Sequence, residues 1–228
     1  MQNNTAKDIR TLGLVLRRTN FGEADRILNL ITPVGKISAI AKSVRKPRSK
    51  LAGGVEMFTL SDYNIHLGRG ELGTVTGAKM VQHFGEIMKD YNRMELAGVM
   101  LKKINAMADG VDTTDYYDLL LQGFQGLNEG ADVRLVEAWF LMRLARIMGE
   151  EVNLYRDIAG ESLEAGTRYD FDTTQMAMKQ NENGVYGTDE IKLLRLMSSA
   201  SLKLVRKVRL DNEMVDKVIE FARMATRT

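Results

Sequence analysis

Hydrophobic and polar residues alternate along the first 84 positions in short runs that Gly- and Pro-containing turns separate. Five runs are rich in aliphatic, aromatic and β-branched residues: 11–16, 24–32, 36–44, 55–67 and 72–84. The run at 36–44 alternates with a period of two, which is typical of a half-buried strand. Five strands at this spacing predict a small closed sheet, and a five-stranded barrel of OB type fits that size.

The pattern changes after residue 85. Residues 87–108 place apolar side chains at helical spacing, and so do 116–127, 135–148, 191–199 and 214–224. Asp132 and Asp211 are expected to cap helices. Residues 150–187 lose this periodicity and contain four glycines, so we expect an irregular or short-strand insertion with a small hairpin around Asn183–Gly184. The predicted class is α+β, with a barrel domain over 1–84 and a helical domain over 85–228 that carries the insertion.

Composition excludes several kinds of site. The chain has no cysteine and two histidines, which rules out disulfides, thiolate metal sites and cysteine nucleophiles. No run approaches the ~18 apolar residues that a membrane-spanning helix needs, and residues 1–7 lack the apolar stretch of a secretory signal. We therefore expect a cytoplasmic protein without metal, cofactor or membrane contact.

Charge is distributed unevenly. Residues 1–84 carry 13 Lys and Arg against 6 Asp and Glu, whereas residues 150–187 carry 3 against 8. Residues 26–55 contain no acid and seven basic residues, which are Arg26, Lys36, Lys42, Arg45, Lys46, Arg48 and Lys50. Because each neutralised phosphate releases counterions, such clustering favours nucleic acid. Pro47 limits the freedom of the segment that carries most of this charge.

Aromatic residues accompany the basic segment. Phe21, Phe58 and Tyr63 lie on or beside the predicted strands and are candidates for stacking on unpaired bases. The alternative is a solvated basic loop beside ordinary core aromatics. On an OB-type barrel the nucleic-acid interpretation is favoured, because positive grooves and aromatic residues are how that fold holds single strands.

Two further basic clusters lie in the helical part. One includes Lys203, Arg206 and Lys207, interleaved with Leu and Val, and the other comprises Arg134, Arg143 and Arg146 around Trp139. The first suits an acidic partner or nucleic acid, and the second could hold a short acidic-aromatic peptide. The alternatives are a solvated helix end for the first and an ordinary amphipathic helix for the second. Signals of catalysis are weak: Gly68-Arg-Gly70 does not continue as a phosphate-binding loop, and no Gly-x-Ser-x-Gly is present. We expect no enzymatic activity.

The segment from Gly13 to Phe58 resembles the N-terminal domain of the RecO family of bacterial DNA repair proteins. The features that carry the resemblance are an apolar strand ending in Arg17-Arg18, then Gly22-Glu-Ala-Asp-Arg26, Gly35-Lys36, Ala41-Lys-Ser-Val-Arg45 and Arg48-Ser-Lys50-Leu. The order of barrel, helices, insertion and terminal helices extends the resemblance across nearly the whole chain, with a weaker match in the second half.

The resemblance implies a recombination mediator of a RecF-type pathway, with an OB-fold domain and a helical domain, acting at the bacterial nucleoid. Family members bind single- and double-stranded DNA, anneal complementary strands and engage the acidic C-terminal tail of single-stranded-DNA-binding protein. With RecR they help to load RecA. Many carry a four-cysteine zinc module in the helical domain; this chain has no cysteine, so its insertion is expected to be zinc-free.

With the charge pattern, this resemblance places DNA on the basic residues of 26–55 and on Arg17, Arg18 and Arg69. It places the partner's tail near Arg143 and Arg146 or on residues 203–209. Two other functions remain open at this point. One is an RNA-binding OB module of translation or RNA metabolism. The other is a nuclease, for which the sequence lacks a clustered set of carboxylates and lysine.

Overall fold

The computed structural model describes residues 7–68, 70 and 72–226. The chain packs as two compact units and divides between Asn128 and Glu129. The boundary expected at residue 84 coincides with the change from strands to helices. The first unit, however, includes two helices that follow the barrel, so an independent domain over 1–84 stays a prediction.

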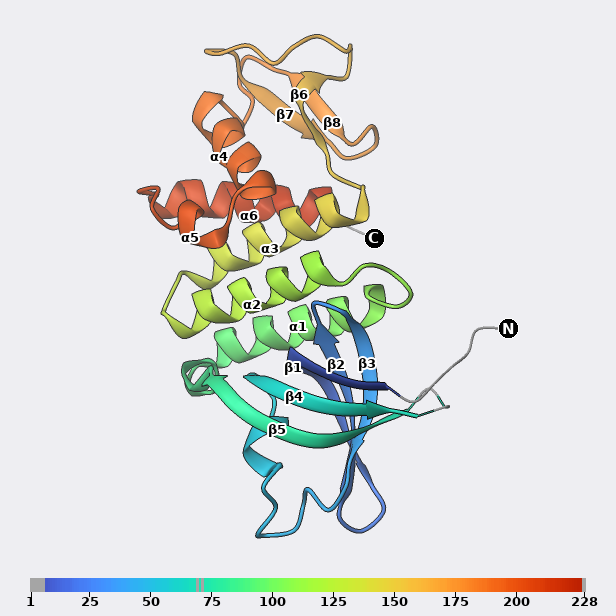
Figure 1. The fold of residues 1–228 in the computed structure, drawn as a ribbon. Helices are drawn as coiled ribbons and strands as arrows, with labels where there is room; N and C mark the ends of the chain where they lie inside the picture. The colour runs from blue at the N-terminus through green and yellow to red at the C-terminus, as the bar shows by residue number, and fades with distance from the viewer. Residues whose placement is uncertain (1–6, 69, 71, 227–228) are drawn as a thin grey trace, which may run out of the picture. The chain divides into compact units, whose positions relative to one another are not determined.

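The first unit is built on a closed five-stranded barrel (Figure 1). Its strands are β1 (Lys7–Phe21), β2 (Asp25–Thr32), β3 (Gly35–Ala41), β4 (Thr59–Leu67) and β5 (Gly73–His83). They pair in the order β1-β2-β3-β5-β4, and β1 closes the barrel against β4. Only the β3–β5 pair is parallel among the described strands of this barrel. This confirms the predicted five-stranded barrel of OB type.

Strand β1 is long enough to pair on both edges. Its first half pairs with β4 and its second half with β2, and the register shifts between Val15 and Arg17. Such a bulge bends a strand and lets it turn a barrel corner. Inward-facing residues of all five strands form the barrel core, which includes Leu28, Tyr63 and Val75. The short 3-10 helix η1 (Ala52–Val55) adds Val55 to that core.

Two helices pack on the barrel within the same unit. After the 3-10 turn η2 (Gly85–Lys89), α1 (Tyr91–Met107) and α2 (Thr114–Asn128) follow. Phe124 of α2 makes edge contacts with Phe58 and Phe84, at centroid distances of 5.5 and 5.7 Å. The Thr113 hydroxyl donates to the carbonyl of Thr32 at 2.7 Å. These contacts give the helices and the barrel a shared core, so the unit ends after α2.

The second unit contains α3 (Val133–Met148), α4 (Thr188–Ser199), α5 (Leu202–Val205) and α6 (Asn212–Ala225). Trp139 of α3 is fully buried, and its Nε1 donates to the carbonyl of Ala200 at 2.9 Å. The predicted caps are confirmed. Asp132 accepts from the backbone of Arg134 and Leu135, and Asp211 accepts from that of Met214.

The insertion forms a small sheet of β6 (Asn153–Asp157), β7 (Tyr169–Asp172) and β8 (Ala177–Gln180), in the order β6-β8-β7. The prediction of a hairpin around Asn183–Gly184 is wrong, because the hairpin joins β7 to β8 and turns at 173–176. There the Asp172 carboxylate accepts from two backbone amides of the turn. The turn at 181–184 instead carries the chain to the other edge of β7, where Tyr186 bridges Tyr169.

Candidate nucleic-acid interface

Residues 42–51, which we call the basic loop, follow β3 as a series of turns. The backbone nitrogen of Lys46 donates to the carbonyl of Ser43 at 3.2 Å, and that of Ser49 donates to the carbonyl of Lys46 at 3.0 Å. Val44 points inward and is buried in the barrel core. The basic loop is therefore anchored from within and shaped by its own hydrogen bonds.

The basic loop is also fixed to the hairpin between β1 and β2, at the end of the barrel where that hairpin turns (Figure 1). The backbone nitrogen of Arg45 donates to the carbonyl of Ala24 at 2.9 Å. The backbone nitrogen of Ser43 donates to the Asp25 carboxylate at 2.6 Å, which helps to hold Ser43 at its positive φ of 53°. The Arg45 guanidinium reaches the carbonyl of Gly22 at 3.3 Å.

The basic side chains of this end point into solvent. Exposed residues include Arg17 on β1 and five on the basic loop, which are Lys42, Arg45, Lys46, Arg48 and Lys50. Within the part of the chain that the structure describes, none of these six forms an ion pair. Phe21, in the adjoining hairpin, is 52% exposed. A group of unpaired cations beside an exposed ring suits a phosphate backbone with an unpaired base.

Two predicted contact residues are held by an acid that the sequence analysis did not single out. Glu56 accepts from Arg18 with one oxygen and from Arg26 with the other, the second at 2.8 Å. Their guanidinium groups are thus partly neutralised at the rim of the candidate interface. Glu56 is the first acid after the basic segment, which is the only sequence signal that could have suggested its role.

Lys36 does not belong to the interface. Its side chain is 12% exposed, and its ammonium group contacts the Asn105 carbonyl at 2.6 Å and the Asp109 carboxylate at 2.8 Å. This geometry does not support the predicted DNA contact there, because the charge attaches the β2–β3 hairpin to the end of α1. Arg69, the remaining predicted contact, lies outside the described residues.

The aromatic candidates divide in the same way. Tyr63 is completely buried, and its hydroxyl donates to the carbonyl of Gly54 at 2.6 Å. Burial raises its pKa well above the ordinary value. The prediction that Tyr63 stacks on bases is therefore wrong, because its ring belongs to the barrel core. Phe58 is half-buried against Phe124. Phe21 is the candidate whose ring faces solvent.

The arginines of the second unit are mostly engaged within it. Arg134 pairs with Asp132 at 2.8 Å and with Asp216 at 2.7 Å. Arg143 donates to the carbonyls of Ser198 and Ser199, each at 3.1 Å, at the end of α4. Arg206 pairs with Glu129 at 2.5 Å. Lys203 and Lys207 are exposed.

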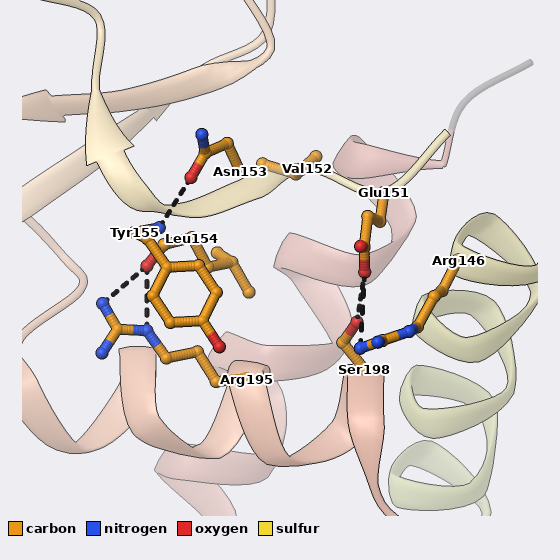
Figure 2. Close-up of a pocket in the computed structure, with 8 residues that line it drawn as sticks. All are labelled: Arg146, Glu151, Val152, Asn153, Leu154, Tyr155, Arg195 and Ser198. Carbon is orange, nitrogen blue, oxygen red and sulfur yellow. Dashed lines mark hydrogen bonds and ion pairs between the residues drawn. The ribbon is translucent and has the colours of Figure 1, made fainter. Parts of the chain in front are cut away.

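A cavity of about 430 Å³ lies among the end of α3, β6 and α4 (Figure 2). Arg146 and Arg195 line it together with Val152, Leu154 and Tyr155. The Arg195 guanidinium lies 4.4 Å from the centre of the Tyr155 ring and donates to the Leu154 carbonyl at 2.9 and 2.7 Å. Sequence reasoning missed Arg195 and Tyr155, because they lie 40 positions apart, with most of the insertion and the start of α4 between them.

The described residues contain no group of three or more His, Cys, Asp or Glu that could hold a metal ion. No helix among them is long and apolar enough to cross a bilayer.

Comparisons with known proteins identify the same protein family in both units. Residues 6–84 match the family model described as "Recombination protein O N terminal", and residues 88–227 match "Recombination protein O C terminal". A protein named DNA repair protein RecO from Dehalococcoides mccartyi is 27% identical over 226 residues, covering 92% of this chain and 86% of the relative.

Two other relatives carry the same name. The protein from Rubrobacter xylanophilus is 32% identical over 142 residues, covering 61% of this chain and 57% of the relative. The protein from Heliobacterium modesticaldum is 37% identical over 158 residues, covering 68% and 57%. The chain thus spans less than two thirds of these two relatives and most of the Dehalococcoides protein.

Proposed function

Since the chain belongs to the RecO family of DNA repair and recombination proteins, we propose that it acts as a recombination mediator. In this role it binds single- and double-stranded DNA and anneals complementary strands. It also helps RecA to load onto strands coated with single-stranded-DNA-binding protein. The observation that carries the proposal is the basic loop, whose five exposed cations are anchored beside the exposed ring of Phe21.

The mechanism follows from the chemistry of these basic groups toward a phosphate backbone. Lysine and arginine neutralise phosphates, which are the same for every sequence, so binding is expected to be sequence-independent and strongly salt-dependent. Annealing brings together two strands of like charge with their bases exposed, and a cationic surface lowers their repulsion. No bond is made or broken, so the proposed role needs neither a catalytic residue nor a cofactor.

Strand binding and annealing test this proposal directly. The variant Arg45→Ala/Lys46→Ala/Arg48→Ala removes three exposed cations of the basic loop, and Lys102→Ala, an exposed lysine on α1, is the matched control. The wild type and the control should bind a single strand and accelerate annealing of naked complementary oligonucleotides, without ATP or metal. The loop variant should do both poorly. Failure of the wild type to bind DNA would refute the proposal.

We further propose that the second unit binds the acidic C-terminal tail of single-stranded-DNA-binding protein, in the cavity of Figure 2. The cavity combines Arg146, whose side chain is half exposed, with apolar Val152 and the exposed ring of Tyr155. An acidic peptide that ends in apolar residues matches both features. The other candidate surface is the exposed pair Lys203 and Lys207.

A fluorescent tail peptide separates these two surfaces. The ion pair between Arg146 and Glu151 is long, at 3.8 Å, so most of the Arg146 charge is available to a peptide. Arg146→Glu should therefore weaken peptide binding at least tenfold. Lys203→Glu/Lys207→Glu should leave binding unchanged. The reverse result would move the tail to residues 203–209, and no binding to the wild type would remove this partner.

RecR, and RecA through it, are partners that we propose from family membership alone, as is action at the bacterial nucleoid in the cytoplasm. The alternative function is RNA binding within translation or RNA metabolism. Competition between DNA and RNA oligonucleotides of one sequence distinguishes the two. A clear preference for RNA, with no response to single-stranded-DNA-binding protein, would favour the alternative.

A further inference from the structure

A second cationic surface, separate from the basic loop's exposed tip, lies on the outer face of β1, β4 and β5. It is a hollow of about 360 Å³ whose lining includes Arg10, Lys50, Asp62, Asn64, Gly77 and Lys79. The strand register explains the grouping, because Arg10 is opposite Asn64, Asn64 is opposite Gly77 and Asp62 is opposite Lys79. Three neighbouring strands thus present one small polar basin to solvent.

Gly77 creates the depth of this hollow. It lies inside β5, and its backbone is not in the left-handed region that usually calls for glycine. A Cβ at this position would come within 2.9 Å of the Asn64 side-chain nitrogen. Glycine weakens a strand interior, and in strands it often marks a point where a ligand approaches the backbone. The missing side chain leaves room above the strand and keeps the Asn64 amide accessible.

The hollow carries a net positive charge. Arg10 donates to both carboxylate oxygens of Asp62, at 3.1 Å to one and 2.5 Å to the other, which offsets the single acid of the lining. These hydrogen bonds lower the pKa of Asp62, so the pair stays ionised at neutral pH. Lys50 and Lys79 have no ion pair among the described residues. Two free ammonium groups and an amide donor suit a phosphate oxygen.

We propose that this hollow seats a phosphate group of a nucleic-acid backbone, so that the DNA track continues from the basic loop onto β4 and β5. Lys50 supports this continuity, because it belongs both to the basic loop and to the lining of the hollow. The inference rests on the proposed function. The phosphate comes either from the strand that crosses the basic loop or from a second strand held at the same time.

Photocrosslinking tests the seat, and the absence of native cysteine allows single labels. Thr76→Cys places a photoreactive azidophenacyl group at the hollow, Pro47→Cys places it on the basic loop, and Val99→Cys on α1 gives the background; all three positions are exposed. The probe is a radiolabelled 30-nucleotide DNA. Crosslinking at residue 76 at least tenfold above that at residue 99 is expected.

The stoichiometry identifies the strand. Crosslinking at residue 76 with one equivalent of DNA assigns the phosphate to the same strand, and crosslinking only with a second equivalent assigns it to another. Both results support the seat. Crosslinking at residue 47 but only background at residue 76 would refute the proposed phosphate site in the hollow and leave the proposed function standing. Background at both positions would refute both.

A charge reversal gives a second measurement on the unlabelled protein. Lys79→Glu should weaken single-strand binding at least fivefold and reduce the slope of log K against log salt by ~0.7, the value for one phosphate contact on a single strand. Lys102→Glu is the matched control on α1. If both variants keep the slope and affinity of the wild type, the hollow holds no phosphate.

Discussion

The backbone nitrogen of Arg45 lies 2.9 Å from the carbonyl oxygen of Ala24, and this hydrogen bond joins the basic loop to the β1–β2 hairpin. With the Ser43–Asp25 contact and the buried Val44, it fixes the loop before any ligand arrives. A fixed loop presents its charges without the entropy cost of ordering them on binding. The exposed ring of Phe21 is held beside them by the same contacts.

The first prediction concerns the charge of the basic loop. Replacing Lys42, Arg45, Lys46, Arg48 and Lys50 by alanine should weaken single-strand binding and reduce the salt slope by ~0.7 for each phosphate contact that is lost. Stability should change little, because these side chains are exposed. Titrations at several salt concentrations measure the slope. An unchanged slope would reject the loop as a binding element.

The second prediction concerns Glu56, which holds Arg18 and Arg26. Glu56→Gln keeps the size of the side chain and removes its charge, so the two guanidinium groups should become available to phosphates. DNA affinity should rise and the salt slope should steepen. The Arg18–Glu56 pair is exposed and the Arg26–Glu56 pair is partly buried. Because surface ion pairs contribute about 0–1 kcal/mol, the stability loss should be small. Weaker DNA binding by this variant would show that Glu56 orients the arginines productively.

The third prediction separates two aromatic residues. Phe21→Ala should weaken single-strand binding by about 1–3 kcal/mol, the usual contribution of one stacked base, and should affect duplex binding less. Tyr63→Phe should leave DNA binding unchanged but lower the free energy of unfolding by about 1–3 kcal/mol, because the buried Gly54 carbonyl loses its donor. Binding titrations and urea denaturation distinguish these effects.

The fourth prediction is a pH dependence of the second unit. The hydrogen bond from the Arg134 side chain is the main cause that lowers the pKa of Asp132. A carboxyl whose folded pKa is depressed stabilises the fold above its unfolded pKa, about 3.9, and loses that contribution as pH falls through the folded value. Asp132→Asn keeps the helix cap but lacks the charge. The stability advantage of the wild type over this variant should therefore be present at pH 7 and shrink below pH 4.

The fifth prediction concerns the insertion. Its turns are held by side-chain carboxylates, since Asp157 accepts from the amides of Ala159 and Glu161, and Asp172 from those of Thr174 and Gln175. Prolonged treatment with a strong chelator should therefore leave the melting temperature unchanged. Asp157→Ala/Asp172→Ala should lower it. A melting temperature that falls on chelation and recovers with zinc would contradict this account.

Much of the barrel could be predicted from the sequence, because a residue's side of a strand decides its burial. The apolar run predicts only 11–16 of strand β1, because outer positions at both ends, such as Arg10 and Arg17, are polar and interrupt the run. The sheet of the insertion was harder to predict. Its strands have four or five residues, and polar turn contacts contribute much of its order.

The sequence predicts the candidate site only where its basic residues lie close together along the chain. The basic loop stood out because residues 26–55 lack acids, and its five cations are indeed exposed. The sequence gives no indication that Glu56 reaches Arg18 across 38 positions, or that Lys36 reaches Asp109. Those pairs depend on which strands and helices become neighbours, and single-residue chemistry does not encode that.

The most direct test of the central claim is the annealing of two complementary oligonucleotides that are coated beforehand with single-stranded-DNA-binding protein, with and without this protein. The account predicts acceleration without ATP or metal, and loss of that acceleration in the five-residue loop variant. No acceleration, with naked strands still bound, would contradict it and would leave a general nucleic-acid-binding barrel protein.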